Sequence, residues 1–295
     1  MATLRELKGR IGSVASSEKI TGAMKMISSA KMHRAESDLR KLLPFRTQIE
    51  TIIGNLLSSD ADFSSPLSEP REVGTAAIVV LGSDDGLCGG YNINIFKELL
   101  VRLREAREKW GEDVKITVFT VGRKIDRAVR KIADSSMTVI NNPEVNSKSA
   151  PDAVKGFAHR LCDMYLAGEV DAVDILYMNF QSVSRQRLRV DHYLPVDPAT
   201  LTASAAKAAC RPCIFEPDAA TIYRSVLPMY LLSVMQEVFT ENRASEQAAR
   251  IMAMQSANDN AKNLLEELQL EYNKLRQQGI TTELLDILGG QVKND

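Results

Sequence analysis

Residues 229–278 contain neither glycine nor proline: MYLLSVMQEVFTENRASEQAARIMAMQSANDNAKNLLEELQLEYNKLRQQ. Apolar side chains recur along this stretch mostly three or four residues apart, the spacing of one face of an α-helix. Its middle, residues 255–263, is polar and poor in large side chains, so it would form a weak core for an oligomeric coiled coil. We therefore predict one very long helix in residues 217–295. The apolar face comprises Leu231, Met235, Val238, Ala249, Met252, Ala261, Leu264, Leu268, Leu275, Ile280, Leu284 and Ile287.

The N-terminal segment, residues 1–57, shows a similar pattern. Apolar residues follow heptad spacing from Leu4 to Val14, and the spacing is interrupted before Ile20. No proline precedes Pro44, and a helix of that length would span about 65 Å, more than the diameter of a small domain. We expect it to protrude or to pack on a partner. Three glycines, each costing about 1 kcal/mol of helix propensity, are expected where something packs closely: Gly9, Gly12 and Gly22.

Opposite charge distinguishes the two end segments. Residues 1–57 carry ten basic and five acidic side chains, a net charge of +5. Residues 216–295 carry seven basic and twelve acidic side chains, a net charge of −5. Exposed ion pairs stabilise little individually, but opposite fields favour pairing of the two helices over pairing of each with its own copy. The pattern favours one long antiparallel coiled coil.

The middle segment, residues 74–196, has the pattern of an α/β domain. Strands and helices alternate along it, which predicts a mainly parallel, Rossmann-like sheet with helices packed on it. A Ser- and Pro-rich linker, residues 58–73, precedes it, and a connection, residues 197–216, follows it. The predicted strands are Thr75–Leu81, Lys115–Val121, Ala172–Phe180 and a half-exposed edge strand, Arg185–Tyr193; the predicted helices are Ile93–Trp110, Lys124–Ala133 and Ala150–Leu166.

Composition limits the class of protein. The chain has 295 residues, 44% of them hydrophobic, and a formal net charge of −1, which argues against a globally basic nucleic-acid binder. The longest apolar run, Ala76–Leu81, is far shorter than the roughly 20 residues of a membrane span. Four cysteines do not make a disulfide framework in a chain of this length. We expect a soluble protein of a reducing, cytoplasmic compartment.

One glycine cluster resembles a binding loop. Residues 82–90 (GSDDGLCGG) follow the first predicted strand, where a dinucleotide-binding fold places its phosphate loop. The glycine spacing fits neither GxGxxG nor GxxxxGK[ST], and Asp84 and Asp85 would repel a phosphate. The pattern favours a tight structural turn over a nucleotide site.

No catalytic or metal-binding constellation stands out. Cys210 and Cys213 form a CxxC pair, but a second such pair, paired histidines or a strand-to-helix context is missing. Chance placement is the favoured interpretation of this pair. Asp84–Asp85 and Glu266–Glu267 are more typical of solvated charges than of general acid–base pairs.

Four motifs resemble those of a known family. They are EKITGAMKMISSAKMHRAE (residues 18–36), GLCGGYNINI (86–95), CIFEPD (213–218) and the long segment from Ser245 to Gly290 with its ITTELLDILGG ending. In this order, and nearly from end to end, the chain resembles the gamma subunits of bacterial F-type ATP synthases.

The resemblance implies a central rotor shaft without catalytic activity of its own. Residues 1–57 and 217–295 would be the shaft helices, standing in a hexamer of alpha and beta subunits. Residues 74–196 would be the foot, next to the epsilon subunit and the membrane ring of c subunits. Rotation would couple ion flow through that ring, typically of hydrogen ions, to ATP synthesis or hydrolysis. The location would be peripheral, at the cytoplasmic face of the bacterial inner membrane.

The resemblance also implies contact residues. Met24, Lys25, Arg250, Gln277 and Thr281 match positions that meet the alpha/beta hexamer. Two more, Phe215 and Glu216, match the foot near epsilon and the c-ring. No cofactor is expected on this chain, because ATP, ADP and Mg²⁺ would be bound by partner subunits; no nucleic acid is expected either.

Two other functions remain to be compared with the rotor. One is a dinucleotide-dependent enzyme built on the middle domain, against which the missing GxGxxG and the two long end helices argue. The other is a free-standing coiled-coil adaptor, against which the middle domain and the four motifs argue.

Overall fold

The computed structural model describes residues 3–57, 65–133, 137–141, 144–199, 201 and 215–291. The chain divides into two compact units. One comprises Met1–Ser28 and Ile251–Asp295, and the other comprises Ser29–Arg250. Two long helices, α1 (Leu4–Leu57) and α6 (Ala219–Gln291), contribute to both units.

Both helices run through residues that usually weaken a helix. Pro44 lies inside α1 and Pro228 inside α6, and α6 also continues through Gly279. A proline removes one backbone N–H donor, and a glycine costs about 1 kcal/mol, but neither loss outweighs the remaining turns of helices of 54 and 73 residues. The predicted long helices are therefore confirmed.

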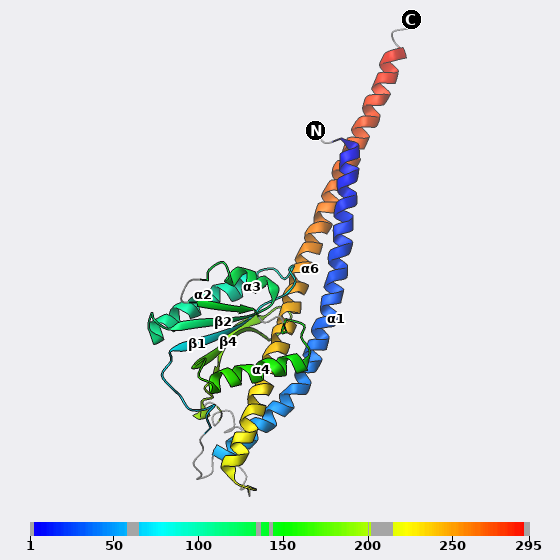
Figure 1. The fold of residues 1–295 in the computed structure, drawn as a ribbon. Helices are drawn as coiled ribbons and strands as arrows, with labels where there is room; N and C mark the ends of the chain where they lie inside the picture. Colours follow the sequence, from blue (N-terminus) through cyan, green and yellow to red (C-terminus); the bar gives the residue numbers. More distant parts are fainter. Residues whose placement is uncertain are drawn as a thin grey trace. The chain divides into compact units, whose positions relative to one another are not determined.

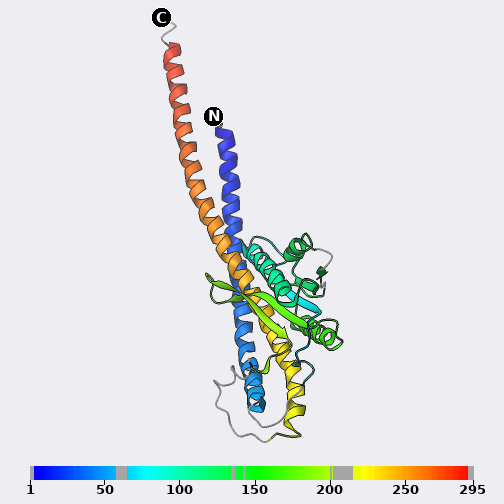
Figure 2. The same cartoon turned by 90° about the vertical axis from the view of Figure 1, so that its left-hand side faces the viewer.

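In the unit formed by residues 1–28 and 251–295, the two helices lie antiparallel, as Figures 1 and 2 both show. Leu7 and Leu268 are buried in it. The Nδ2 atom of Asn258 donates to the backbone oxygen of Glu18 at 2.8 Å. A methyl group at Gly22 would lie 3.5 Å from that Nδ2 atom. Within this chain such a neighbour is present at Gly22, whereas at Gly9 and Gly12 nothing lies within 4 Å of an added methyl. Close packing of a partner subunit at Gly9 and Gly12 stays a prediction.

The unit Ser29–Arg250 is built on a five-stranded sheet in the order β3-β2-β1-β4-β5. The strands β1, β2, β3 and β4 are parallel, and β5 runs antiparallel to β4 at one edge. A mainly parallel sheet with an edge strand at this position is what the sequence predicted. The bounds are β1 Thr75–Leu81, β2 Lys115–Val121, β3 Met137–Asn141, β4 Ala172–Phe180 and β5 Gln186–Leu194.

Helices cover both faces of the sheet. α2 (Tyr91–Trp110) and α3 (Arg123–Val129) pack on one face, and α4 (Pro151–Leu166) packs on the other (Figure 1). Side chains of β1 alternate between two cores, Ala76, Ile78 and Val80 facing α2. Ala77, Val79 and Leu81 face a larger core that α4 shares with the parts of α1 and α6 in this unit.

The sequence misplaced a few elements. The strand β3 was not predicted, because five residues at a sheet edge give too short an apolar pattern. The predicted helix Lys124–Ala133 is wrong at its end, since α3 stops at Val129 and turns follow it. The predicted edge strand Arg185–Tyr193 lies one residue further along, at Gln186–Leu194.

Candidate functional site

The carboxyl edge of the sheet is the place where a doubly wound α/β domain binds its ligand. The crossovers from β1 to β2 and from β3 to β4 lie on opposite faces, so the strand order reverses between β1 and β4. Ligands of such sheets bind in the crevice outside the carboxyl ends at this reversal. In this chain the helix α6 occupies that crevice through Asn242.

The side-chain amide of Asn242 bridges the two diverging strands. Its Nδ2 donates to the backbone oxygen of Gly82, just after β1, at 3.4 Å, and its Oδ1 accepts the backbone N–H of Met178 in β4 at 3.3 Å. The hydroxyl of Tyr91, the first residue of α2, donates to the same Oδ1 at 2.6 Å. Burial raises the pKa of Tyr91 well above its usual value, so this donor keeps its proton. Both polar atoms of the Asn242 amide, Nδ2 and Oδ1, are thus hydrogen-bonded to other residues of this chain.

The loop of residues 82–90 is a structural loop, as its glycine spacing indicated. The carboxylate of Asp84 accepts the backbone N–H of Arg123 at 3.1 Å, and both the N–H and the hydroxyl of Ser147, at 3.0 and 2.8 Å. The next carboxylate, Asp85, lies 2.6 Å from the ammonium of Lys148, which lowers the pKa of Asp85. The two aspartates therefore join loops of this chain and are not arranged around a phosphate.

A buried ion pair on α6 faces the same loop. Arg250 and Glu246 lie 2.7 Å apart and are both buried. The guanidinium also donates to the backbone oxygens of Gly86 at 3.3 Å and Asp85 at 3.4 Å. Burial raises the pKa of Glu246, and the bond from Arg250 opposes this shift.

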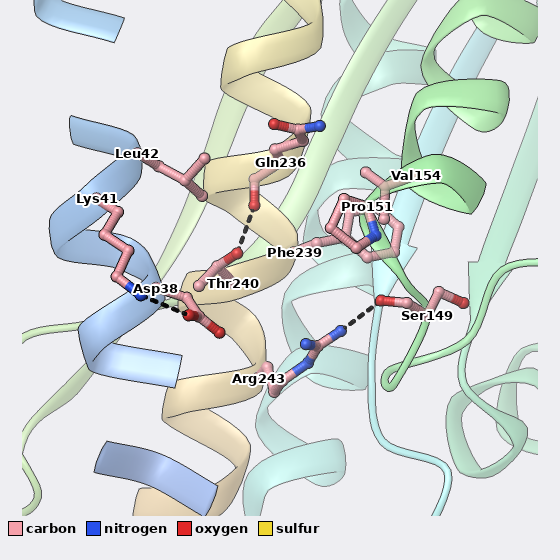
Figure 3. Close-up of a pocket in the computed structure, with 10 residues that line it drawn as sticks. All are labelled: Asp38, Lys41, Leu42, Ser149, Pro151, Val154, Gln236, Phe239, Thr240 and Arg243. Atoms are coloured by element: carbon pink, nitrogen blue, oxygen red, sulfur yellow. Dashed lines mark hydrogen bonds and ion pairs between the residues drawn. The ribbon is translucent and has the colours of Figure 1, made fainter. Parts of the chain in front are cut away.

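Arg243, on the neighbouring turn of α6, holds the loop that leads into α4. Its Nε and Nη2 atoms donate to the backbone oxygens of Ser147 at 3.1 Å and Ser149 at 2.7 Å. Figure 3 shows this guanidinium at the side of a pocket between α1, α6 and the start of α4, with a volume of about 310 Å³. Apolar side chains line much of the pocket: Leu42, Pro151, Val154 and Phe239. The charged side chains that line it are Arg243 from α6 and Asp38 and Lys41 from α1.

The predicted contact residues fall in both units. In the unit of residues 1–28 and 251–295, Met24 and Lys25 are half-buried on α1, whereas Gln277 and Thr281 are exposed on α6, one turn apart. In the other unit, Arg250 is held by its own chain. Their roles as partner contacts stay predictions.

The predicted foot residues lie just before α6. Phe215 is half-buried against the larger core, and Glu216 is exposed. Cys210 and Cys213 lie outside the described residues. The other two cysteines, Cys88 and Cys162, are buried free thiols, and burial raises the pKa of Cys162 to about 11, which makes it unreactive.

Four residues that make these bonds were not predicted from the sequence: Asn242, Arg243, Tyr91 and Ser147. A signal for the first was present. Continuing the alternating steps of four and three residues from Leu231 through Met235 and Val238 leads to Asn242 and then to Ser245, so two polar residues stand in the apolar seam of α6. Both are buried. The bonds of Arg243 and Ser147 gave no such signal, because their partners are backbone atoms far away in the sequence.

Within the described ranges, no group of three or more His, Cys, Asp or Glu side chains is arranged to hold a metal ion. No described helix is both long enough and apolar enough to cross a membrane.

Known proteins are similar to this chain over almost its whole length. A family model described as ATP synthase matches residues 3–292. The ATP synthase gamma chain of Bacteroides thetaiotaomicron is 38% identical over 302 residues, which cover 99% of this chain and 100% of the relative. The chain belongs to the ATP synthase gamma chain family. As a gamma chain it is a non-catalytic subunit, the central stalk or rotor of F-type ATP synthase.

Further similarities span the same length. The gamma chain of Phocaeicola vulgatus is 39% identical over 298 residues, covering 99% of this chain and 100% of the relative. A chain of the Euglena gracilis mitochondrial ATP synthase, solved with OSCP, F1 and the c-ring, superposes with a TM-score of 0.63 at 21% identity. That superposition covers 98% of this chain and 93% of the other, and it shows that the two chains share a fold. Because gamma chains are non-catalytic subunits, membership of this family shows that the enzyme hypothesis for the middle domain is wrong.

Proposed function

We propose that this gamma chain couples ion flow through a c-ring to ATP synthesis or hydrolysis by turning inside a hexamer of alpha and beta subunits. The observation that carries the proposal is the similarity to gamma chains over the whole length of both proteins. The bonds of Asn242 to the ends of β1 and β4 support it, because a rotor needs its α/β domain joined firmly to the shaft helix α6. ATP, ADP and Mg²⁺ would accordingly be bound by the partner subunits.

The contact with the alpha/beta hexamer would involve Met24, Lys25, Gln277 and Thr281, which leave surface available to a partner. Polar and charged side chains on a shaft allow it to move past a sleeve without a broad apolar seam. A direct contact of the hexamer with Arg250 would need its bonds to Gly86 and Asp85 to be exchanged for bonds to the partner.

The contact with the epsilon subunit and the c-ring would lie near Phe215 and Glu216. This gives the subunit a peripheral position at the cytoplasmic face of the bacterial plasma membrane, reached only through its partners. The matching division of the chain is a shaft of residues 1–57 and 217–295, a foot of residues 74–196, and two connecting segments, 58–73 and 197–216.

The experiment is an affinity purification of the tagged chain from membranes of its own organism. Co-purification of alpha, beta, epsilon and c subunits, identified by mass, together with ATP hydrolysis, is the expected result. A matched control uses the same tag on a chain that carries Gln277→Glu and Thr281→Glu, whose charges should weaken the hexamer contact and leave the epsilon and c subunits bound. Recovery of the chain alone, or as a homodimer without ATPase activity, would favour the adaptor hypothesis instead.

A further inference from the structure

One turn of α6 carries most of the polar bonds between this helix and the carboxyl edge of the sheet. Glu241 accepts a bond from Asn179 in β4 at 2.7 Å, Asn242 bridges β1 and β4, and Arg243 holds the loop before α4. All of these residues belong to the unit Ser29–Arg250. The helix and the sheet are therefore joined by directional bonds as well as by apolar packing.

Asn242 is the central member of this set. The last registered pair of β1 and β4 is Val80 with Leu176, and Gly82 and Met178 lie two residues beyond it. There the strands part, and the amide of Asn242 takes the place that one peptide of the sheet would occupy, accepting from Met178 and donating to Gly82. The side chain is only 2% exposed, so water cannot replace these partners.

A polar residue at a seam position weakens packing, yet it defines register. Apolar side chains around Asn242, such as Val238, allow small sliding and turning of a helix at little cost, because dispersion contacts are not directional. The amide of Asn242 makes hydrogen bonds to three other residues, and these bonds are directional. They therefore hold α6 at one position along its axis and at one rotation about that axis relative to the sheet.

We propose that Asn242 is a positioning residue that fixes the rotational setting of α6 against the α/β domain, so that torque passes between them without slip. This rests on the proposed rotor function. Slip, meaning rotation of α6 relative to the α/β domain, would reduce coupling most under load, when the c-ring drives ATP synthesis. It would matter less during ATP hydrolysis in leaky vesicles, where the shaft turns against little resistance.

The test uses complete ATP synthase reconstituted in vesicles with the wild-type chain, Asn242→Ala or Tyr91→Phe. The measured quantity is the rate of ion-driven ATP synthesis divided by the rate of ATP hydrolysis in uncoupled vesicles of the same preparation. We expect this ratio to fall several-fold for Asn242→Ala and by a smaller factor for Tyr91→Phe, which removes the hydroxyl that bonds to the Oδ1 atom and the backbone oxygen of Asn242 and leaves the bonds of its amide to Gly82 and Met178. The Tyr91 variant keeps the test decisive if the Asn242 variant does not assemble.

The matched control is Ile116→Val, a core change in β2 on the face covered by α2 and α3. It lowers stability and leaves every polar bond of α6 in place, so the ratio should not change. An unchanged ratio in Asn242→Ala and Tyr91→Phe, or an equal fall in Ile116→Val, would overturn the positioning role. Failure of the wild-type enzyme to synthesise ATP would instead overturn the proposed function, and the positioning role with it.

Discussion

At the scale of single residues, Gly122 shows how closely the loops at the carboxyl edge approach each other. Its φ of 115° is unfavourable for any side chain, and a methyl group there would lie 2.9 Å from the backbone carbon of Gly82. We expect Gly122→Ala to lower the free energy of unfolding by about 1–3 kcal/mol. Chemical denaturation of the isolated chain measures this.

The control for that change is Gly156→Ala. Gly156 lies inside α4 with nothing within 4 Å of an added methyl, so alanine there should raise stability by about 0.5–1 kcal/mol. Equal effects at the two glycines would show that the close approach of the loops at Gly122 is not what constrains that residue.

Glu241 supplies a pH-dependent prediction. Burial raises its pKa, so the folded chain binds this proton more tightly than the unfolded chain does. The ionised carboxylate therefore destabilises the fold above its folded pKa, and the loss is relieved as the pH falls toward the unfolded value of about 4.3. Glu241→Gln keeps an acceptor for Asn179 without the charge. We expect it to raise the melting temperature at pH 7.

The measurement is the difference in melting temperature between the Glu241→Gln and wild-type chains, followed from pH 7 downward. That difference should shrink on acidification and vanish near the unfolded pKa. A glutamine variant that is less stable than wild type at pH 7 would show that the carboxylate is stabilised by Arg46 and Arg189 more than it is penalised by burial.

At the scale of elements, the packing of α6 on α4 depends on aromatic contacts. Phe239 of α6 meets Phe157 of α4 edge to face, with ring centroids 6.3 Å apart. We expect Phe239→Ala to cost about 3–5 kcal/mol, because it removes a buried ring and leaves a cavity. Met229→Ala on the same helix, at a side chain that is 56% exposed, should change stability by less than about 0.5 kcal/mol. Similar losses in both variants, measured by denaturation, would contradict the assigned packing.

The sequence predicted most elements because their patterns are local. The bounds of β1, β2 and β4 agree with the prediction. The strands β1 and β2 are rich in β-branched residues and each is followed by a glycine, whereas β4 is a mostly apolar run that ends before the polar Gln181. The edge strand β3 was missed because its pattern of five residues is too short to distinguish from a loop. The bonds of Asn242 and Arg243 could not be predicted, because each joins residues that are 64 to 160 positions apart.

At the scale of the whole molecule, the two units should respond separately to truncation. Residues 280–295 belong to the unit of Met1–Ser28 and Ile251–Asp295. Their removal should leave the thermal transition of Ser29–Arg250 within about 0.5 kcal/mol of its wild-type stability, because it deletes none of that unit's core. Differential scanning calorimetry of the truncated and full chains tests this. Loss of the transition would show that the two units fold as one.

The sequence by itself determined the two long helices, their antiparallel pairing, the alternating strands and helices between them, and the gamma-chain family. Periodicity and charge depend on residues that are close in the sequence, and the order of the motifs can be read along the chain, so none of these features requires the folded structure to be known. Only the tertiary structure decided that α6 fills the crevice of the sheet, and that Asn242 bonds there to both β1 and β4. The physical reason is that a hydrogen bond depends on distance and angle between particular atoms, which chain folding alone brings together.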